Sequence, residues 1–186
     1  MSALHITSLQ QLDQTVQSVH AVGERTVRAL RDLLASESDS FQVLRLLKFS
    51  DSNRLPSGER SLNLIEQVNQ TLTSLARLQA ARWVLEQHPA LLLHGLRLQL
   101  GPHVGFDLYS VEPGLLAAEV FAASHPARHD RLRQDLARLA NSPDVLHRYV
   151  FFSCPGFARG RQMALETGSG IEVWSLPADQ GFKGMS

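Results

Sequence analysis

The chain has 186 residues, of which 44% are hydrophobic and 19% charged, a composition that excludes a largely disordered protein. Residues 1–90 and residues 91–186 each carry nine acidic and nine basic side chains, so no global charge attracts the protein to nucleic acid or to a membrane. No apolar run approaches the ~20 residues of a membrane span, and the single cysteine, Cys154, excludes an intrachain disulfide. We therefore expect a cytoplasmic protein with no secretory signal and no membrane partner.

Helical periodicity marks the N-terminal region. Apolar residues recur at steps of three and four from Leu9 to Leu34, and Gly23 is a position at which this helix could be interrupted. A polar break then separates this helix from a short one, which is expected over residues 41–49. We expect the helical region, residues 1–58, to pack on the rest of the protein or to mediate binding of a protein partner or a second copy.

A long helix is expected after a loop. Ser57 is a suitable helix cap, and apolar residues recur with helical spacing from Leu62 to Trp83. The helix should end near His88, because Pro89 disfavours the helical conformation in the residue before it. A helix of this length typically spans a domain or packs against a partner chain.

The hydrophobic period then changes from that of a helix to that of a strand. Leucines alternate with polar residues over residues 96–100, a turn is expected at residues 101–102, and a second alternating segment covers residues 104–109. After another turn, residues 115–123 form a third alternating segment. Three strands joined by two tight turns predict an antiparallel meander, with Asp107 on its second strand opposite the leucines.

Helices and strands alternate after the meander, as is typical of an α/β protein. The next helix is expected to be capped by Ser124 and to bury a stripe made of Leu132, Leu136 and Leu139. The remaining expected elements are a central apolar strand over residues 147–153, a short helix over residues 161–166, a last strand over residues 171–176 and a loose tail over residues 178–186.

Two acidic residues fall within the meander, Asp107 on the second strand and Glu119 in the middle of the third. The order of elements, together with Asp107 and the segment Glu119-Val120-Phe121, resembles the PD-(D/E)XK, or restriction-endonuclease-like, superfamily. In this resemblance Asp107 stands for the first acid, and Glu119-Val120-Phe121 stands where the family has E-x-K. The resemblance implies a nuclease-like α/β core over residues 59–177, with a mixed sheet of about five strands and flanking helices.

The chemistry implied by the resemblance is hydrolysis of a phosphodiester with Mg²⁺. Two carboxylates on adjacent strands provide the oxygen ligands that Mg²⁺ prefers, so Asp107 and Glu119 are the implied catalytic and metal-binding residues. The family lysine orients water and stabilises negative charge, but Phe121 occupies its position here. No lysine lies between Lys48 and Lys183, so only an arginine could replace it.

Arginine is plentiful in the second half of the chain. Arg128 and Arg131 follow the motif on the next expected helix. Arg159 and Arg161 lie in a glycine-bounded loop that is either a plain turn or a phosphate-binding segment. An arginine can clamp a phosphate, but it remains protonated and is a poor proton shuttle. These four residues are therefore the candidate phosphate-binding residues.

Three functions remain open at this point. The first is a nuclease-fold protein that has lost hydrolysis and binds nucleic acid or phosphate groups. The second is an active Mg²⁺-dependent nuclease in which an arginine replaces the lysine. The third is a non-catalytic interaction module whose helices bind a partner protein. For Asp107 and Glu119 the alternative to a metal site is a buried polar pair, or a salt bridge to a nearby arginine.

Overall fold

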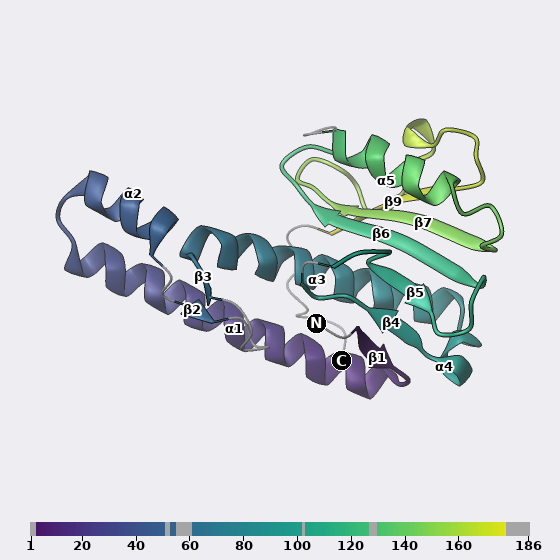
Figure 1. Cartoon of the computed structure of the whole chain (residues 1–186), viewed down its shortest axis with the longest axis horizontal. Helices are drawn as coiled ribbons and strands as arrows, with labels where there is room; N and C mark the ends of the chain where they lie inside the picture. The colour runs from purple at the N-terminus through teal and green to yellow at the C-terminus, as the bar shows by residue number, and fades with distance from the viewer. Residues whose placement is uncertain (1–2, 51–52, 55–60, 102, 127–129, 178–186) are drawn as a thin grey trace.

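The computed structural model describes residues 3–50, 53–54, 61–101, 103–126 and 130–177. These residues form a mixed α/β structure in which helices flank a single large sheet (Figure 1). The helices are α1 (Leu9–Ser36), α2 (Ser40–Phe49), α3 (Leu64–Gln87), α4 (Leu91–His94) and α5 (Arg131–Ala140), with a 3₁₀ turn at Met163–Leu165. The strands are β1 (Leu4–Ile6), β2 (Asn53–Arg54), β3 (Ser61–Leu62), β4 (Leu96–Leu98), β5 (Leu108–Ser110), β6 (Leu116–Ala122), β7 (His147–Ser153), β8 (Gly160–Arg161) and β9 (Glu172–Leu176).

The large sheet has seven strands in the order β1-β4-β5-β6-β7-β9-β8. Strands β4, β5 and β6 form the predicted antiparallel meander, and β7 lies between β6 and β9, parallel to both. The expected number of about five strands was too small, because β1 and β8 were missed at the two edges. These strands have three and two residues, which is too short for a recognisable alternation of apolar and polar side chains.

Strand β6 separates two hydrophobic cores. Leu116, Ala118 and Val120 face the helices α1 and α3, while Ala117 and Phe121 face α5. This confirms the predicted alternation along the strand, and it directs the side chain of Glu119 toward α5. The predicted stripe of leucines on α5 is also buried, against this second core.

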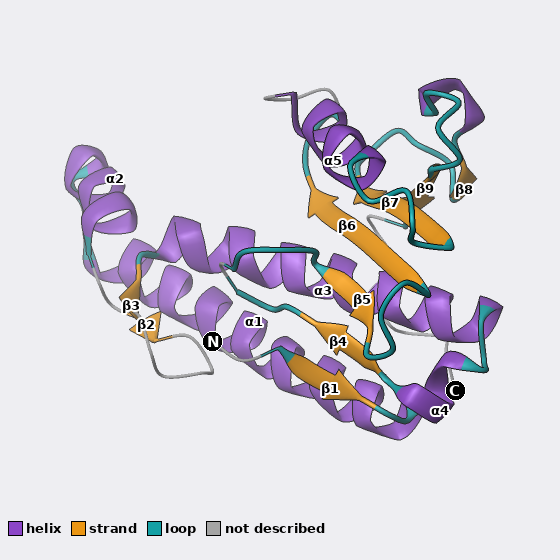
Figure 2. Cartoon of the chain, turned by 45° about the vertical axis from the view of Figure 1, so that its right-hand side comes forward, coloured by secondary structure: helices purple, strands orange, loops and turns teal. Residues whose placement is uncertain are grey.

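Helices α1 and α3 lie side by side and extend beyond the sheet as an arm, with α2 at its far end (Figures 1 and 2). Gly23 continues α1 without interruption and lies against Thr71 of α3. The expected boundary between a helical region at residues 1–58 and a core at residues 59–177 does not separate two units. Strand β1, which belongs to the N-terminal region, pairs with β4 and is part of the sheet. Gly95 allows this pairing: it has a φ of 86°, and a Cβ there would lie 3.1 Å from the carbonyl oxygen of Ile6.

Two helices begin later than predicted. Ser57, the expected cap of the long helix, lies outside the described residues, and α3 begins at Leu64 behind an Asn63 cap that forms a capping box with Glu66. Ser124 does not cap α5, which begins at Arg131. The predicted end of α3 near His88 is confirmed, since the helix ends at Gln87.

Two segments differ from the prediction in kind. The tight turn expected after β4 is a longer connection over residues 99–107, which closes with a hydrogen bond from the Gln99 N–H to the Asp107 carbonyl at 2.9 Å. Strand β5 therefore starts only at Leu108, immediately after Asp107. The helix expected over residues 161–166 is instead the end of β8 followed by the 3₁₀ turn, and the tail over residues 178–186 lies outside the described part of the chain.

Candidate functional site

Asp107 and Glu119 are brought together at the junction of the sheet with α5. Both side chains are buried. The Oδ2 of Asp107 accepts a hydrogen bond of 2.8 Å from the backbone N–H of Val120, the residue after Glu119. This bond fixes the Asp107 carboxylate against β6, beside the strand position that carries Glu119.

Helix α3 supplies the first partner of Asp107. The Arg77 guanidinium donates a hydrogen bond to Oδ1 of Asp107, and Nε2 of His103 lies 3.2 Å from the same oxygen. Arg77 is buried, and burial lowers its pKa while the charge of Asp107 opposes that shift. The Asp107 carboxylate is thus paired with a buried guanidinium from α3, which packs on the sheet face opposite to α5.

Helix α5 supplies the partners of Glu119. Arg131, Asp135 and Arg138 follow each other at steps of four and three, which places them on one face of the helix. Nη1 of Arg138 donates a 2.9 Å hydrogen bond to Oε1 of Glu119. Nη2 of Arg131 lies 3.9 Å from Oε2 of Glu119 and 3.8 Å from Oδ2 of Asp107. Its Nε donates to Oδ2 of Asp135 at 2.9 Å.

We call this set the ionic cluster. It contains three arginines, three carboxylates and one histidine: Arg77, His103, Asp107, Glu119, Arg131, Asp135 and Arg138.

Two carboxyl groups of the ionic cluster, those of Glu119 and Asp135, have raised pKa values. Burial, reinforced by the nearby charges of Asp107 and Asp135, raises the pKa of Glu119 to about 8. Burial likewise raises the pKa of Asp135 to about 6, although Arg131 opposes the shift. Oε2 of Glu119 is buried and has no hydrogen-bond partner among the described residues, so a negative charge on this carboxyl group is poorly stabilised and the protonated form is favoured. At pH 7 Glu119 is then mostly neutral, and three guanidinium groups face two carboxylates.

A magnesium ion does not fit this arrangement. Mg²⁺ requires several oxygen ligands in octahedral geometry, and Asp107 and Glu119 already direct oxygens to Arg77 and Arg138. Three guanidinium groups within the ionic cluster would also repel a divalent cation. Within the part of the chain that the structure describes, no group of three or more His, Cys, Asp or Glu side chains is placed to hold a metal.

An apolar ring, that of Phe121, occupies the position at which the resemblance expects a lysine. Phe121 lies two residues after Glu119 on the same face of β6, is buried in the second core, and stacks on Phe152 with ring centroids 5.9 Å apart. It can neither orient a water molecule nor stabilise a developing negative charge. This face of the strand beside Glu119 therefore contributes packing and no proton-transfer group.

The four candidate phosphate-binding arginines do not come together. Arg131 is part of the ionic cluster, whereas Arg128 lies outside the described residues. Arg159 is exposed in the loop before β8. Arg161 lies on β8, at the edge of the sheet, where it pairs with Glu166 at 2.8 Å and with Glu172 at 3.0 Å. Arg161 therefore forms a separate ion-pair group at the sheet edge and is not part of the ionic cluster.

Sequence reasoning missed three members of the ionic cluster that carry charge, Arg77, Asp135 and Arg138. The spacing of Asp135 and Arg138 after Arg131 was a usable signal, since all three fall on one helical face. Arg77 also gave a signal, because it follows Ser74 by three residues and precedes Ala81 by four, and both of those are buried on α3. A basic residue on a buried helical face requires an acidic partner.

Comparison with known proteins adds no relative: no family model, curated protein or solved structure matches the chain. The fold and the ionic cluster define its class as a mixed α/β protein with charged side chains buried between a sheet and two helices. Among the described residues, no helix is both long and apolar enough to cross a membrane.

Proposed function

We propose that this chain is a restriction-endonuclease-like protein whose catalytic centre is degenerate and which binds nucleic acid through phosphate groups. The order of α3, the β4-β5-β6 meander, α5 and the parallel strand β7 supports the fold assignment. The observation that carries the proposal is the pairing of Asp107 with Arg77 and of Glu119 with Arg138. Guanidinium groups contact the carboxyl oxygens that the implied Mg²⁺ would need: Asp107 neutralises Arg77, and Glu119 accepts a hydrogen bond from Arg138 instead of holding a metal.

The phosphate-binding surface in this proposal is the outer side of the ionic cluster. The side chains of Arg131 and Arg138 are 39% and 46% exposed, so their guanidinium groups reach solvent while also contacting buried carboxylates. Because Glu119 is mostly protonated at pH 7, these two arginines are only partly neutralised. A planar guanidinium can donate two parallel hydrogen bonds to a phosphate, and it can do so without any proton transfer.

Binding should depend on salt, with a shallow slope. With Arg131 and Arg138 as the phosphate contacts, the logarithm of affinity for duplex DNA should fall against the logarithm of salt concentration with a slope of about −2. Replacing Arg138 by glutamine should reduce this slope by about one. Arg133→Gln is the matched control, because it removes the same charge from an exposed position of the same helix. Fluorescence anisotropy with a labelled duplex at several salt concentrations measures both quantities.

Arg138→Lys separates charge from geometry in this experiment. Lysine keeps the positive charge but lacks the planar fork, so affinity should fall less than with glutamine. If the wild type shows no binding at low salt, or if Arg133→Gln lowers affinity as much as Arg138→Gln, then the ionic cluster is not the contact surface and the proposal is wrong.

The metal site provides a second test. Isothermal titration with Mn²⁺ and with Mg²⁺ should give no saturable heat for the wild type, because the arginines hold the carboxylate oxygens. Glu119→Ala is the comparison. Saturable binding by the wild type that disappears in Glu119→Ala would contradict the degenerate centre and favour the active, Mg²⁺-dependent nuclease, in which Asp107 and Glu119 bind metal.

A protein-interaction module remains a second candidate, and one observation favours it. Val27, Leu34 and Leu72 on the α1–α3 arm are exposed although apolar. A hollow of about 400 Å³ also lies between the two helices, lined in part by Val27 and Leu75. This candidate requires a defined oligomer or a bound protein partner, which sedimentation equilibrium of the wild type would detect.

A further inference from the structure

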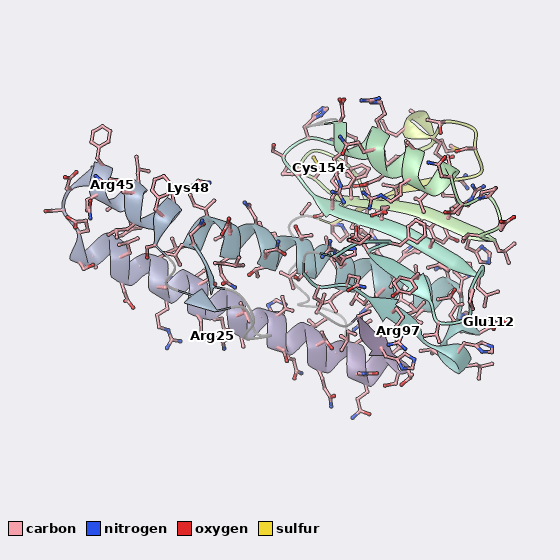
Figure 3. All side chains as sticks on the ribbon, in the orientation of Figure 1. Arg25, Arg45, Lys48, Arg97, Glu112 and Cys154 are labelled. Atoms are coloured by element: carbon pink, nitrogen blue, oxygen red, sulfur yellow. The ribbon has the colours of Figure 1, made fainter. Side chains whose placement is uncertain are left out.

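Helix α2, at the far end of the arm, exposes an unusual combination of side chains. Phe41 and Phe49 are 79% and 77% exposed, and Leu44 is 60% exposed. Arg45 and Lys48 project from the same helix, far from the sheet (Figure 3). Only Val43 of this helix is buried. The helix therefore contributes little to the core and presents most of its apolar surface to solvent.

These five exposed residues occupy one face. At about 100° per residue, Leu44, Lys48, Phe41, Arg45 and Phe49 follow each other in that order within an arc of about 140°. Each basic residue thus lies between apolar ones around the helix. The two phenylalanines are eight residues apart, which corresponds to about 12 Å along the axis.

The charge of this face is entirely positive. Neither Arg45 nor Lys48 forms an ion pair with any described residue. Asp39, the acidic residue that precedes this face, caps α2, where its carboxylate accepts hydrogen bonds from the N–H groups of Phe41 and Gln42. Asp51, three residues after Lys48, lies outside the described residues. A partner of this face must therefore offer both negative charge and flat or apolar surface.

We propose that this face of α2 is a second nucleic-acid contact, which binds single strands by stacking bases on Phe41 and Phe49 while Arg45 and Lys48 contact the backbone. Exposed aromatic rings interleaved with basic side chains are the combination by which proteins bind single strands without sequence preference. Duplex DNA keeps its bases stacked on each other, so it cannot use the two rings. The inference rests on the proposed function, since it adds a site for the same class of ligand.

Two other occupants fit the face less well. A helix that lies in a membrane surface keeps its basic residues apart from its apolar ones, whereas Arg45 and Lys48 lie among the apolar residues of α2. A second copy packed antiparallel on the same face would bring the Arg45 side chains together near the two-fold axis, because Arg45 is close to the middle of the helix. Like charges at that position disfavour the pairing.

The α2 face lies apart from the ionic cluster. From Arg77 back to Leu64, where α3 begins, the helix axis covers about 20 Å, and α2 lies at the far end of the arm (Figure 1). The two surfaces can therefore be altered independently. Substitutions on α2 should leave the buried ion pairs intact, and substitutions in the ionic cluster should leave the rings of Phe41 and Phe49 in place.

The test compares a single strand with a duplex. In fluorescence anisotropy, Phe41→Ala/Phe49→Ala should weaken binding of a short labelled oligothymidylate at least about tenfold, because each stacked base contributes ~1–3 kcal/mol. Binding of a labelled duplex should change less than about twofold. Leu93→Ala/Leu146→Ala is the matched control, since it truncates two exposed apolar residues at other places in the fold. Circular dichroism checks that all variants fold.

The outcomes separate the two proposals. If the wild type binds duplex and single strand, and the Phe41/Phe49 variant binds the single strand as the wild type does, then the α2 contact is wrong and the phosphate-binding proposal is not affected. If the wild type binds neither nucleic acid, both proposals fail. A further outcome is that the Phe41/Phe49 variant keeps its oligothymidylate binding but loses another property of the wild type. Loss of binding to vesicles with anionic lipid would then assign α2 to a membrane surface, and loss of a dimer would assign it to a second copy.

Discussion

Replacing Arg77 by methionine should lower the free energy of unfolding by about 3–5 kcal/mol. The substitution keeps most of the apolar volume of the side chain but leaves Asp107 buried without the cation that now pairs with it. A buried carboxylate that loses its partner must remain charged in a poorly polar environment or take up a proton, and both are unfavourable. Urea denaturation of the two proteins at pH 7 measures the difference.

The double variant Arg77→Met/Asp107→Asn identifies the cause of the loss. If the cost comes from an unpaired charge, removing the charge of Asp107 should restore part of the stability, and the effects of the two substitutions should not add. Arg82→Met is the matched control on the same helix, because the partner of Arg82, Asp13, is 53% exposed and can be solvated by water when the pair is broken, so the loss should be smaller. Equal losses for Arg77→Met and Arg82→Met would contradict a special role of the buried pair.

Glu119→Gln should stabilise the protein at alkaline pH and have little effect at acidic pH. Below about pH 4.5, Glu119 is protonated in both the folded and the unfolded state. Between about pH 4.5 and 8 the unfolded chain releases the proton while the folded protein keeps it, so the free energy of unfolding falls as pH rises. The whole loss, on the order of 5 kcal/mol, is present above about pH 8. Glutamine keeps the oxygen that accepts from Arg138 but does not ionise.

Thermal denaturation at a series of pH values tests this expectation. The wild type should lose thermal stability between about pH 5 and 8, and Glu119→Gln should lose much less. Asp135→Asn provides the contrast, because the raised pKa of Asp135, about 6, places its contribution between about pH 4 and 6. If Glu119→Gln instead destabilises the protein equally at all pH values, Glu119 is ionised throughout and acts as the permanent partner of Arg138.

The experiments on Arg77 and Glu119 also test how two carboxyl groups can be buried side by side in the ionic cluster. Two buried carboxyl groups without a metal are stable only if a neighbouring positive charge pairs with them or if they become neutral. Both solutions occur side by side here: Arg77 neutralises Asp107, and a raised pKa leaves Glu119 mostly protonated at pH 7. Phe121 and Phe152 then pack against each other in the adjoining core, where a lysine would be costly to bury.

Much of the fold could be predicted from the sequence by its local periodicities. The apolar steps that define α1, α3 and α5 are repeated over several turns, and the alternation along β6 assigns Glu119 to the face opposite Val120. These patterns are long, and each is decided by which side chains avoid water, so neighbouring residues are sufficient to reveal them. The start of α3 was predicted too early, at a Ser57 cap, although Asn63 and Glu66 have the capping-box spacing that marks its true start.

The short elements depended on the tertiary structure. Strand β1 has three residues, and its pairing with β4 relies on the close approach of its backbone to Gly95, a contact between distant segments of the chain. The true start of β5 was likewise set by the connection that ends in Asp107. A segment of two or three residues has too few side chains and hydrogen bonds to be a stable strand by itself. Its conformation is therefore decided by the sheet that it joins.

For the candidate site, the sequence by itself determined the two acids, the phenylalanine two residues after Glu119 and the abundance of arginine in the second half of the chain. It did not determine which arginine binds which acid. Arg77 is thirty residues from Asp107, and Arg138 is nineteen from Glu119, so these pairs exist only because α3 and α5 pack beside the same strands. The protonation of Glu119 likewise depends on complete burial between charged neighbours, a property of the assembled structure. Charge pairing and acidity are set by distance and solvent exclusion, and only the tertiary structure provides both.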